Sequence, residues 1–134
     1  MIASIEKCRE PLRTVLSALH SWVMTTYPDT VMSQPDSMDK DGWLHYAIPV
    51  AQGGSRPFAG ARFRLDKPMG VTVLLAAKPE RDPLEWVHAD MGKLRKLGFA
   101  LGLPRPFEKD VSEEGLRYLF DLVAQAHTAI SGSA

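Results

Sequence analysis

Residues 58–77 constrain the fold of this chain more than any other segment, because an alternating pattern of apolar and polar residues there gives way to a continuous apolar run. The alternation over Phe58–Asp66 predicts a strand with one exposed face, and the run Val71–Ala77 predicts a strand covered on both faces. Lys67–Gly70 between them predicts a turn. This pair of strands indicates a small antiparallel sheet on which helices pack.

A third strand is indicated upstream, over Trp43–Val50, where apolar residues again occupy alternate positions. Gln52–Ser55, which contains two glycines, predicts a short connection to the strand that begins at Phe58. Three strands with short connections form an antiparallel meander. We expect the face that carries Leu44 and Phe63 to lie beneath the helices.

The first helix follows a stripe of apolar residues, at alternating spacings of three and four, between Ile5 and Trp22. Tyr27–Asp29 ends it, because a residue before proline disfavours the helical conformation. Pro11 lies inside the stripe, where it removes a backbone hydrogen bond. The helix therefore either begins near Pro11 or kinks there.

Two helices are predicted after the sheet. Asp82–Glu85 combines a capping aspartate, a proline and a glutamate, and Gly98 marks the end of the helix that starts there. Phe99–Glu108, with two prolines, predicts an extended or looped connection. The last helix is predicted over Ser112–Ile130, and residues 131–134 are expected to form a frayed tail.

Length and charge limit the classes of protein to consider. The chain has 134 residues, which predicts one domain over 1–134, and its 16 basic and 16 acidic residues balance. Zero net charge gives no whole-chain attraction for nucleic acid, so we do not expect that partner. No apolar run approaches the ~18 residues that span a membrane, and the N-terminus lacks the apolar core of a secretory signal. We therefore expect a cytoplasmic protein of bacterial type without a membrane partner.

No residue pattern points to a metal, a cofactor or a catalytic nucleophile. The histidines are far apart, and we expect His20 and His88 on helix surfaces and His127 at the edge of the core. Cys8 lies on an apolar stripe, which is typical of a buried, inert thiol. The acidic segment 33–42 lacks the closing glutamate of a calcium loop and predicts a solvated loop. We therefore expect no metal site, no cofactor and no catalytic residues.

Strand alternation brings aromatic and basic residues onto the face opposite the helices. They are Trp43, His45, Phe58, Arg62, Arg64 and Thr72, with Arg56 and Lys67 at the adjacent rims. Aromatic rings and guanidinium groups on a sheet stack planar ligands and pair with carboxylates or phosphates. The candidate ligand-binding residues are therefore Trp43, His45, Arg62, Arg64 and Lys67. The alternative is that the arginines only keep an exposed strand soluble.

The second side of the strand over Val71–Ala77 also needs a cover, because Leu74 and Ala76 are apolar. A homodimer contact through this face of the sheet would supply one. The balanced charge of the chain, which gives little repulsion between copies near neutral pH, is compatible with such self-association.

The order of certain short motifs is similar to that of a known family. These motifs are Tyr27–Asp29 at a helix end, Phe63–Pro68 before the apolar strand Val71–Leu75, Leu97–Gly98 and Arg105, and a final helix over Ser112–His127. Over about Pro11 to Ile130 this order resembles the YdhG-like family of small bacterial proteins of unknown function. An iron-handling role has been proposed for some of them. The histidine that follows the family's lysine is Pro68 here, and the chain has no dense ridge of carboxylates for iron, so no residue is assigned to that role.

Together these patterns predict an α+β fold. It consists of an N-terminal helix, a three- or four-stranded antiparallel sheet, and two C-terminal helices packed on one face. The favoured function is a non-enzymatic binding or interaction module that recognises an anionic ligand or an acidic protein partner through the aromatic and basic face. Two alternatives stay open: a dimeric protein chaperone of the secretion-chaperone type, and an enzyme whose site forms only on dimerisation.

Overall fold

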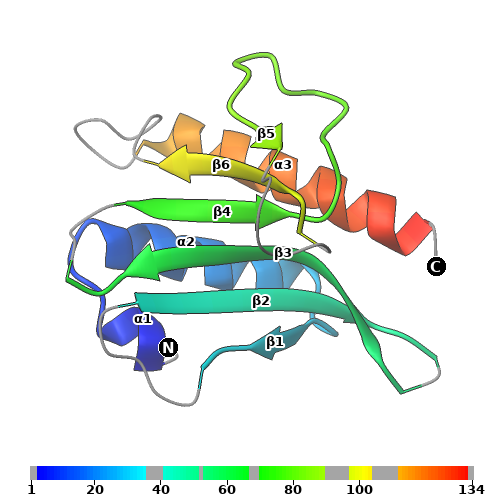
Figure 1. The fold of residues 1–134 in the computed structure, drawn as a ribbon, viewed down its shortest axis with the longest axis horizontal. Helices are drawn as coiled ribbons and strands as arrows, with labels where there is room; N and C mark the ends of the chain where they lie inside the picture. The colour runs from blue at the N-terminus through cyan, green and yellow to red at the C-terminus, as the bar shows by residue number, and fades with distance from the viewer. Residues whose placement is uncertain are drawn as a thin grey trace.

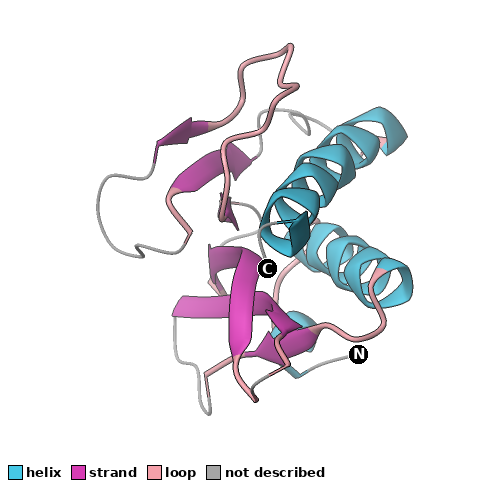
Figure 2. Ribbon diagram, turned by 90° about the vertical axis from the view of Figure 1, so that its right-hand side faces the viewer, coloured by secondary structure: helices cyan, strands magenta, loops and turns pink. Residues whose placement is uncertain are grey.

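An antiparallel sheet with helices on one of its faces forms the framework of the molecule, as predicted (Figures 1 and 2). The computed structural model describes residues 3–35, 41–51, 53–66, 70–89, 97–103 and 112–132. Its elements are α1 (Ala3–Glu6), α2 (Leu12–Thr26), β1 (Val31–Ser33), β2 (Asp41–Pro49), β3 (Ser55–Arg64), β4 (Val71–Leu75), β5 (His88–Ala89), β6 (Phe99–Leu103) and α3 (Glu113–Gly132).

The sheet has six strands in the order β1-β2-β3-β4-β6-β5, and each strand is antiparallel to its neighbours. The central meander β2-β3-β4 is confirmed, but the expected three or four strands are too few. β1 and β5 have three and two residues, too few to show an alternating pattern. Phe99–Leu103, predicted as extended or looped, forms β6 and pairs with β4.

The main N-terminal helix begins next to Pro11, which confirms one of the two predicted alternatives. Pro11 stands directly before α2, and α1 is a separate short helix. The Glu10 carboxylate accepts hydrogen bonds from the Thr14 backbone N–H at 2.9 Å and the Thr14 hydroxyl at 2.7 Å. Glu10 therefore satisfies a donor of the first turn, as a capping side chain does.

The hydrophobic core lies between the sheet and the two long helices. The Trp22 ring of α2 stacks on the Phe120 ring of α3, with centroids 4.8 Å apart and planes at 3°. Cys8 is a buried member of this core, and burial raises the pKa of its thiol to about 11. The prediction that the thiol is buried is therefore confirmed, and its raised pKa is consistent with low reactivity. The largest fully buried side chains of this core are Ile5, Leu12, Leu16, Leu19, Leu44, Tyr46, Phe58, Leu75, Leu101 and Leu119.

The helix predicted from Asp82 is wrong. The chain makes a single turn there, closed by a 2.9 Å hydrogen bond from the Glu85 N–H to the Asp82 carbonyl, and Glu85 adopts a left-handed φ of 54°. The Asp82 carboxylate accepts the N–H groups of Trp86 and Val87, at 3.1 and 2.9 Å, and the Tyr118 hydroxyl. The capping aspartate therefore closes an isolated turn instead of starting a helix, and the chain continues into β5.

One C-terminal helix, α3, is found in the described part of the chain, where two were expected; residues 90–96 lie outside it. The Ser112 Oγ accepts the Gly115 N–H at 2.9 Å, which confirms the predicted N-cap. The helix runs to Gly132, so residues 131 and 132 extend it and are not part of a frayed tail.

Phe58 faces the core, where the sequence had placed it on the opposite side. Tyr46 pairs with Ala59, but the next residue, Ala47, pairs with Pro57, so Phe58 is the extra residue of a β-bulge. The bulge reverses the strict alternation of side chains at this point. Phe58 is fully buried, with its ring centroid 5.8 Å from that of Tyr27.

Gly60 allows β2 and β3 to approach closely. A Cβ at this position would lie 2.7 Å from the Leu44 carbonyl oxygen, which belongs to the backbone and cannot swing away. Gly102, on β6 of the same sheet, has no atom within 4 Å of the corresponding point.

We expect Gly60→Ala to lower the free energy of unfolding by about 1–3 kcal/mol, because the added methyl group forces the paired strands apart. Chemical denaturation would measure this, with Gly102→Ala as the matched control that leaves stability nearly unchanged. Equal stabilities for the two variants would contradict the close approach at Gly60.

We expect Tyr118→Phe to lower the free energy of unfolding by about 1 kcal/mol. The Tyr118 hydroxyl donates to Asp82 and accepts the Leu84 N–H at 2.9 Å, so both partners lose a hydrogen bond. Thermal denaturation is a suitable measurement. The control is Arg117→Ala, which removes only the exposed pair with Glu113 on the same helix.

Candidate functional site

The candidate site lies on the outer face of the sheet, by which we mean the side chains of Trp43, His45, Arg62 and Thr72, on the side away from α2 and α3. Trp43 on β2 pairs with Arg62 on β3, which in turn pairs with Thr72 on β4. All three side chains are half-buried. The next residue of β3, Phe63, is buried on the helix side. The predicted direction of the strand faces is therefore confirmed around these positions.

The aromatic part of the outer face is formed by Trp43 and His45. Their ring centroids are 4.7 Å apart and their planes make an angle of 43°. Gly60 pairs with His45 and has no side chain, so a Cβ there would lie 3.0 Å from the His45 Cδ2. Burial lowers the pKa of His45. His45 is therefore neutral near pH 7 and contributes an aromatic surface, whereas the positive charge beside it comes from Arg62.

Over β4 and β6 the same side of the sheet is covered by the chain itself. Leu74, Leu97 and Ala100 form a small apolar cluster in which each side chain is at most 1 % exposed, and Ala76 packs against it. This confirms that β4 is covered on both faces. A homodimer contact was expected to cover Leu74, but Leu97 of the same chain already covers it. The homodimer itself stays a prediction.

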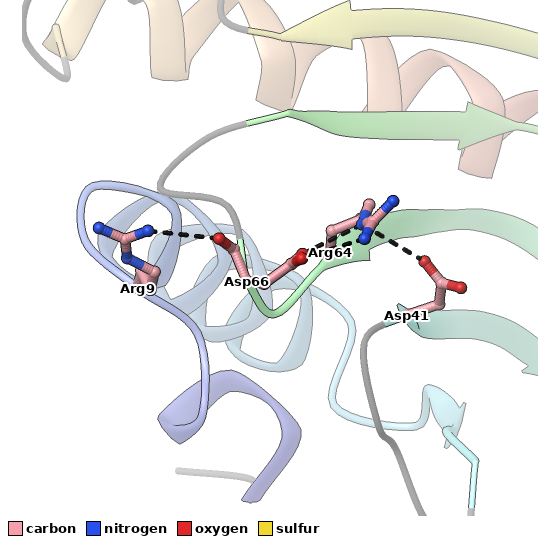
Figure 3. A network of polar contacts seen from close by, with 4 residues as sticks. All are labelled: Arg9, Asp41, Arg64 and Asp66. Atoms are coloured by element: carbon pink, nitrogen blue, oxygen red, sulfur yellow. Dashed lines mark hydrogen bonds and ion pairs between the residues drawn. The ribbon is translucent and has the colours of Figure 1, made fainter.

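Arg64, a predicted ligand-binding residue, has carboxylate partners in its own chain (Figure 3). Its Nε and Nη2 atoms donate to the two carboxylate oxygens of Asp66, each at 3.0 Å, and its Nε lies 3.8 Å from an Asp41 oxygen. Arg9 donates to the Asp66 carbonyl at 3.3 Å and so ties this turn to the segment before α2. Arg64 is exposed and its charge is balanced by these neighbours, whereas Arg62 is half-buried and pairs with Trp43 across the strands, which makes Arg62 the stronger candidate for a ligand. Lys67 lies outside the described residues.

Two histidines differ from their predicted places. His20 is half-buried, and its Nδ1 lies 2.9 Å from the Tyr46 hydroxyl, which reaches it from β2. His88 is exposed as predicted but lies in β5 instead of a helix. His127 lies at the edge of the core, as predicted, with its ring stacked on that of Tyr27.

Two hollows were not predicted, because each is formed by segments far apart in the sequence. One, of about 250 Å³, lies between residues 78–81 and α3. Three of its polar residues contact one another: the Gln125 side chain exchanges two 2.9 Å hydrogen bonds with the Arg81 backbone, and Arg81 lies 3.5 Å from Asp121. The other, of about 340 Å³, lies at the C-terminal end of α2 beside His127.

Large apolar side chains are exposed at two places in the described chain. Val31 is 45 % exposed on β1, and Leu84 is 59 % exposed in the segment before β5. β1 and β5 are the two opposite edges of the sheet, so these residues do not belong to one patch.

Within the described ranges, no group of three or more His, Cys, Asp and Glu side chains is arranged to hold a metal ion. The same ranges contain no helix of the length and apolarity that crossing a membrane requires.

Comparisons of the chain with protein-family models, with curated proteins and with solved structures gave no match. The resemblance to the YdhG-like family stays a prediction from the order of its motifs. The candidate site therefore depends on the geometry of the described residues alone.

We expect the protein to lose stability as the pH falls from 7.5 to 5.5. Burial lowers the pKa of His20, His45 and His127 below the ordinary value of 6.5. The unfolded chain therefore binds more protons than the folded chain below about pH 6.5, and the free energy of unfolding falls with the pH there. Urea denaturation at several pH values would measure this.

A matched pair of variants isolates the contribution of one histidine. His127→Phe keeps an aromatic ring on Tyr27 and should make the pH dependence shallower, whereas His88→Gln, at an exposed position, should leave it unchanged. An identical pH dependence in both variants would contradict the assignment to His127.

Proposed function

We propose that this protein is a non-enzymatic binding module that recognises an anionic group, carried by an acidic protein partner or a small ligand, through Trp43, His45 and Arg62. The observation that carries the proposal is the pairing of Trp43 with Arg62 across β2 and β3, with the His45 ring beside them on the outer face. A planar group can stack on the rings while its carboxylate pairs with the guanidinium.

The way in which these side chains are held supports recognition rather than solubility alone. A solubilising arginine on an exposed strand needs no aromatic neighbours, but here two rings and the arginine are half-buried together. Partial burial lowers the local dielectric constant and strengthens a charge-assisted hydrogen bond. The binding energy is therefore expected to be concentrated at the half-buried Arg62 and Trp43, with a smaller share from Arg64, which is exposed to water and lies beside Asp66 and Asp41.

The described surface gives less support to the two alternatives. A chaperone for unfolded segments needs a contiguous apolar surface, whereas the exposed large apolar residues of the described chain, Val31 and Leu84, lie toward opposite edges of the sheet. An enzyme needs titratable groups that converge on a cleft. The outer face offers instead one neutral histidine and one arginine that stays charged.

The test is a titration of the full chain with a short peptide in which glutamates flank one tyrosine, and in parallel with 4-hydroxybenzoate as the small ligand. Binding is followed by the NMR signal of the Trp43 indole N–H. We expect saturable binding that weakens as salt is raised, because the pair between Arg62 and the carboxylate is partly screened. Tighter binding of the peptide would favour a protein partner, and tighter binding of the benzoate a small ligand.

Arg62→Gln should weaken binding of either probe at least about tenfold, which corresponds to about 1.4 kcal/mol. Arg117→Gln, at an exposed position of α3, is the matched control and should bind like the parent chain. The proposal fails if Arg62→Gln binds as tightly as the parent, or if neither probe moves the Trp43 signal.

A further inference from the structure

The hollow at the C-terminal end of α2 has the properties of a small ligand site. It is formed where the segment that leaves α2 passes the end of β2 and the side of α3, and its volume is about 340 Å³. This volume is at the lower end of the range for small-molecule pockets and suits a ligand of a few heavy atoms. The lining residues are Thr26, Tyr27, Pro28, Asp29, Thr30, Ile48, Pro49 and His127.

Two aromatic rings of this lining are fixed in place by packing. The Tyr27 and His127 rings are stacked, with centroids 3.6 Å apart and planes at 10°. Phe58, the bulged residue of β3, meets both rings edge-on, at centroid distances of 5.8 and 4.8 Å. The rings therefore need little rearrangement to accept a ligand, which reduces the entropy lost on binding.

The charge of the hollow is negative. Asp29 is its carboxylate, and no lysine or arginine is among its lining residues. The hollow also lies at the C-terminus of α2, where the last carbonyl groups have no partner within the helix and the helix dipole is negative. The last turn of α2 contains no basic residue to offset this dipole.

His127 does not reverse this charge at neutral pH. The titratable groups of the hollow besides His127 are Tyr27 and Asp29. Burial lowers the pKa of His127 and raises that of Tyr27, so both side chains are neutral near pH 7. Asp29 is exposed.

From this geometry we infer that the hollow between Tyr27, Asp29 and His127 binds an alkylammonium group. An alkylammonium group is attracted by the electron-rich faces of aromatic rings, by a carboxylate and by helix carbonyls. Its alkyl part can pack on Ile48 and Pro49. The group could come from a free amine or from a lysine side chain of a partner protein. The inference does not depend on the proposed function, because it uses other residues and a ligand of opposite charge.

The test is an NMR titration of the full chain at pH 7 with butylammonium, and with butanol and butyrate as neutral and anionic probes of similar shape. We expect saturable shifts confined to the backbone N–H signals of Thr26, Tyr27, Asp29, Thr30, Ile48 and His127. Butylammonium should bind with a millimolar Kd, and the other two probes at least about tenfold more weakly. Equal binding of butanol would show an apolar hollow without charge selectivity and would overturn the inference, as would the absence of saturable shifts.

Asp29→Asn should weaken butylammonium binding about two- to fivefold, the range expected for one solvent-exposed ion pair. Asp121→Asn, which removes an exposed carboxylate from the other hollow, should leave it unchanged. Both substitutions are at exposed positions, so unchanged spectra of the free variants confirm that each is folded. Equal weakening by both variants would mean that the net charge of the protein is responsible, which contradicts a local site.

A lysine-containing peptide and its lysine-acetylated form distinguish the two sources of the ammonium group. Tighter binding of the unmodified peptide than of butylammonium, lost on acetylation, supports a lysine side chain from a partner. Weaker binding of this peptide than of butylammonium supports a free amine. Binding that survives acetylation overturns recognition of the ammonium group.

Discussion

The register between β2 and β3 is the constraint on which the rest of the structure depends. Leu44 pairs with Ala61 on the side of the sheet that α2 and α3 cover, and Trp43 pairs with Arg62 on the outer face. Because side chains alternate along a strand, a slip of one residue would bury Arg62 and expose Phe63. Only one register of β2 against β3 therefore buries the apolar side chains and leaves the polar side chains on the outer face.

Both candidate sites depend on local irregularities of β3: a glycine at position 60 and a bulge at Phe58. Gly60 removes a side chain where β2 and β3 approach, and the His45 ring occupies the space beside Trp43. The bulge at Phe58 turns an aromatic ring into the core, where it supports the rings of Tyr27 and His127. Local irregularities of one strand thus shape two surfaces of opposite character, one with a guanidinium and one with a carboxylate.

Sequence patterns predicted best where local signals and tertiary packing agree. The Ser112 cap, the start of a helix next to Pro11 and the central meander were all confirmed. Asp82 shows the opposite case, because its signal for a helix start was sound but Tyr118, 36 residues away, binds the same carboxylate and stabilises a turn. Arg62 and Arg64 were equivalent in the sequence, and the tertiary structure distinguished them by leaving Arg62 half-buried and Arg64 exposed beside Asp66 and Asp41.

The period of the apolar residues was sufficient to determine the α+β class and the direction in which Trp43, His45 and Arg62 point, since a strand has only two faces and one must be buried. The hollow beside His127 was decided by the tertiary structure alone. Tyr27 and His127 are a hundred positions apart, and their rings meet because α2 and α3 pack on the same face of the sheet. Contacts of that kind depend on the shapes of packed surfaces, and no pattern of neighbouring residues encodes them.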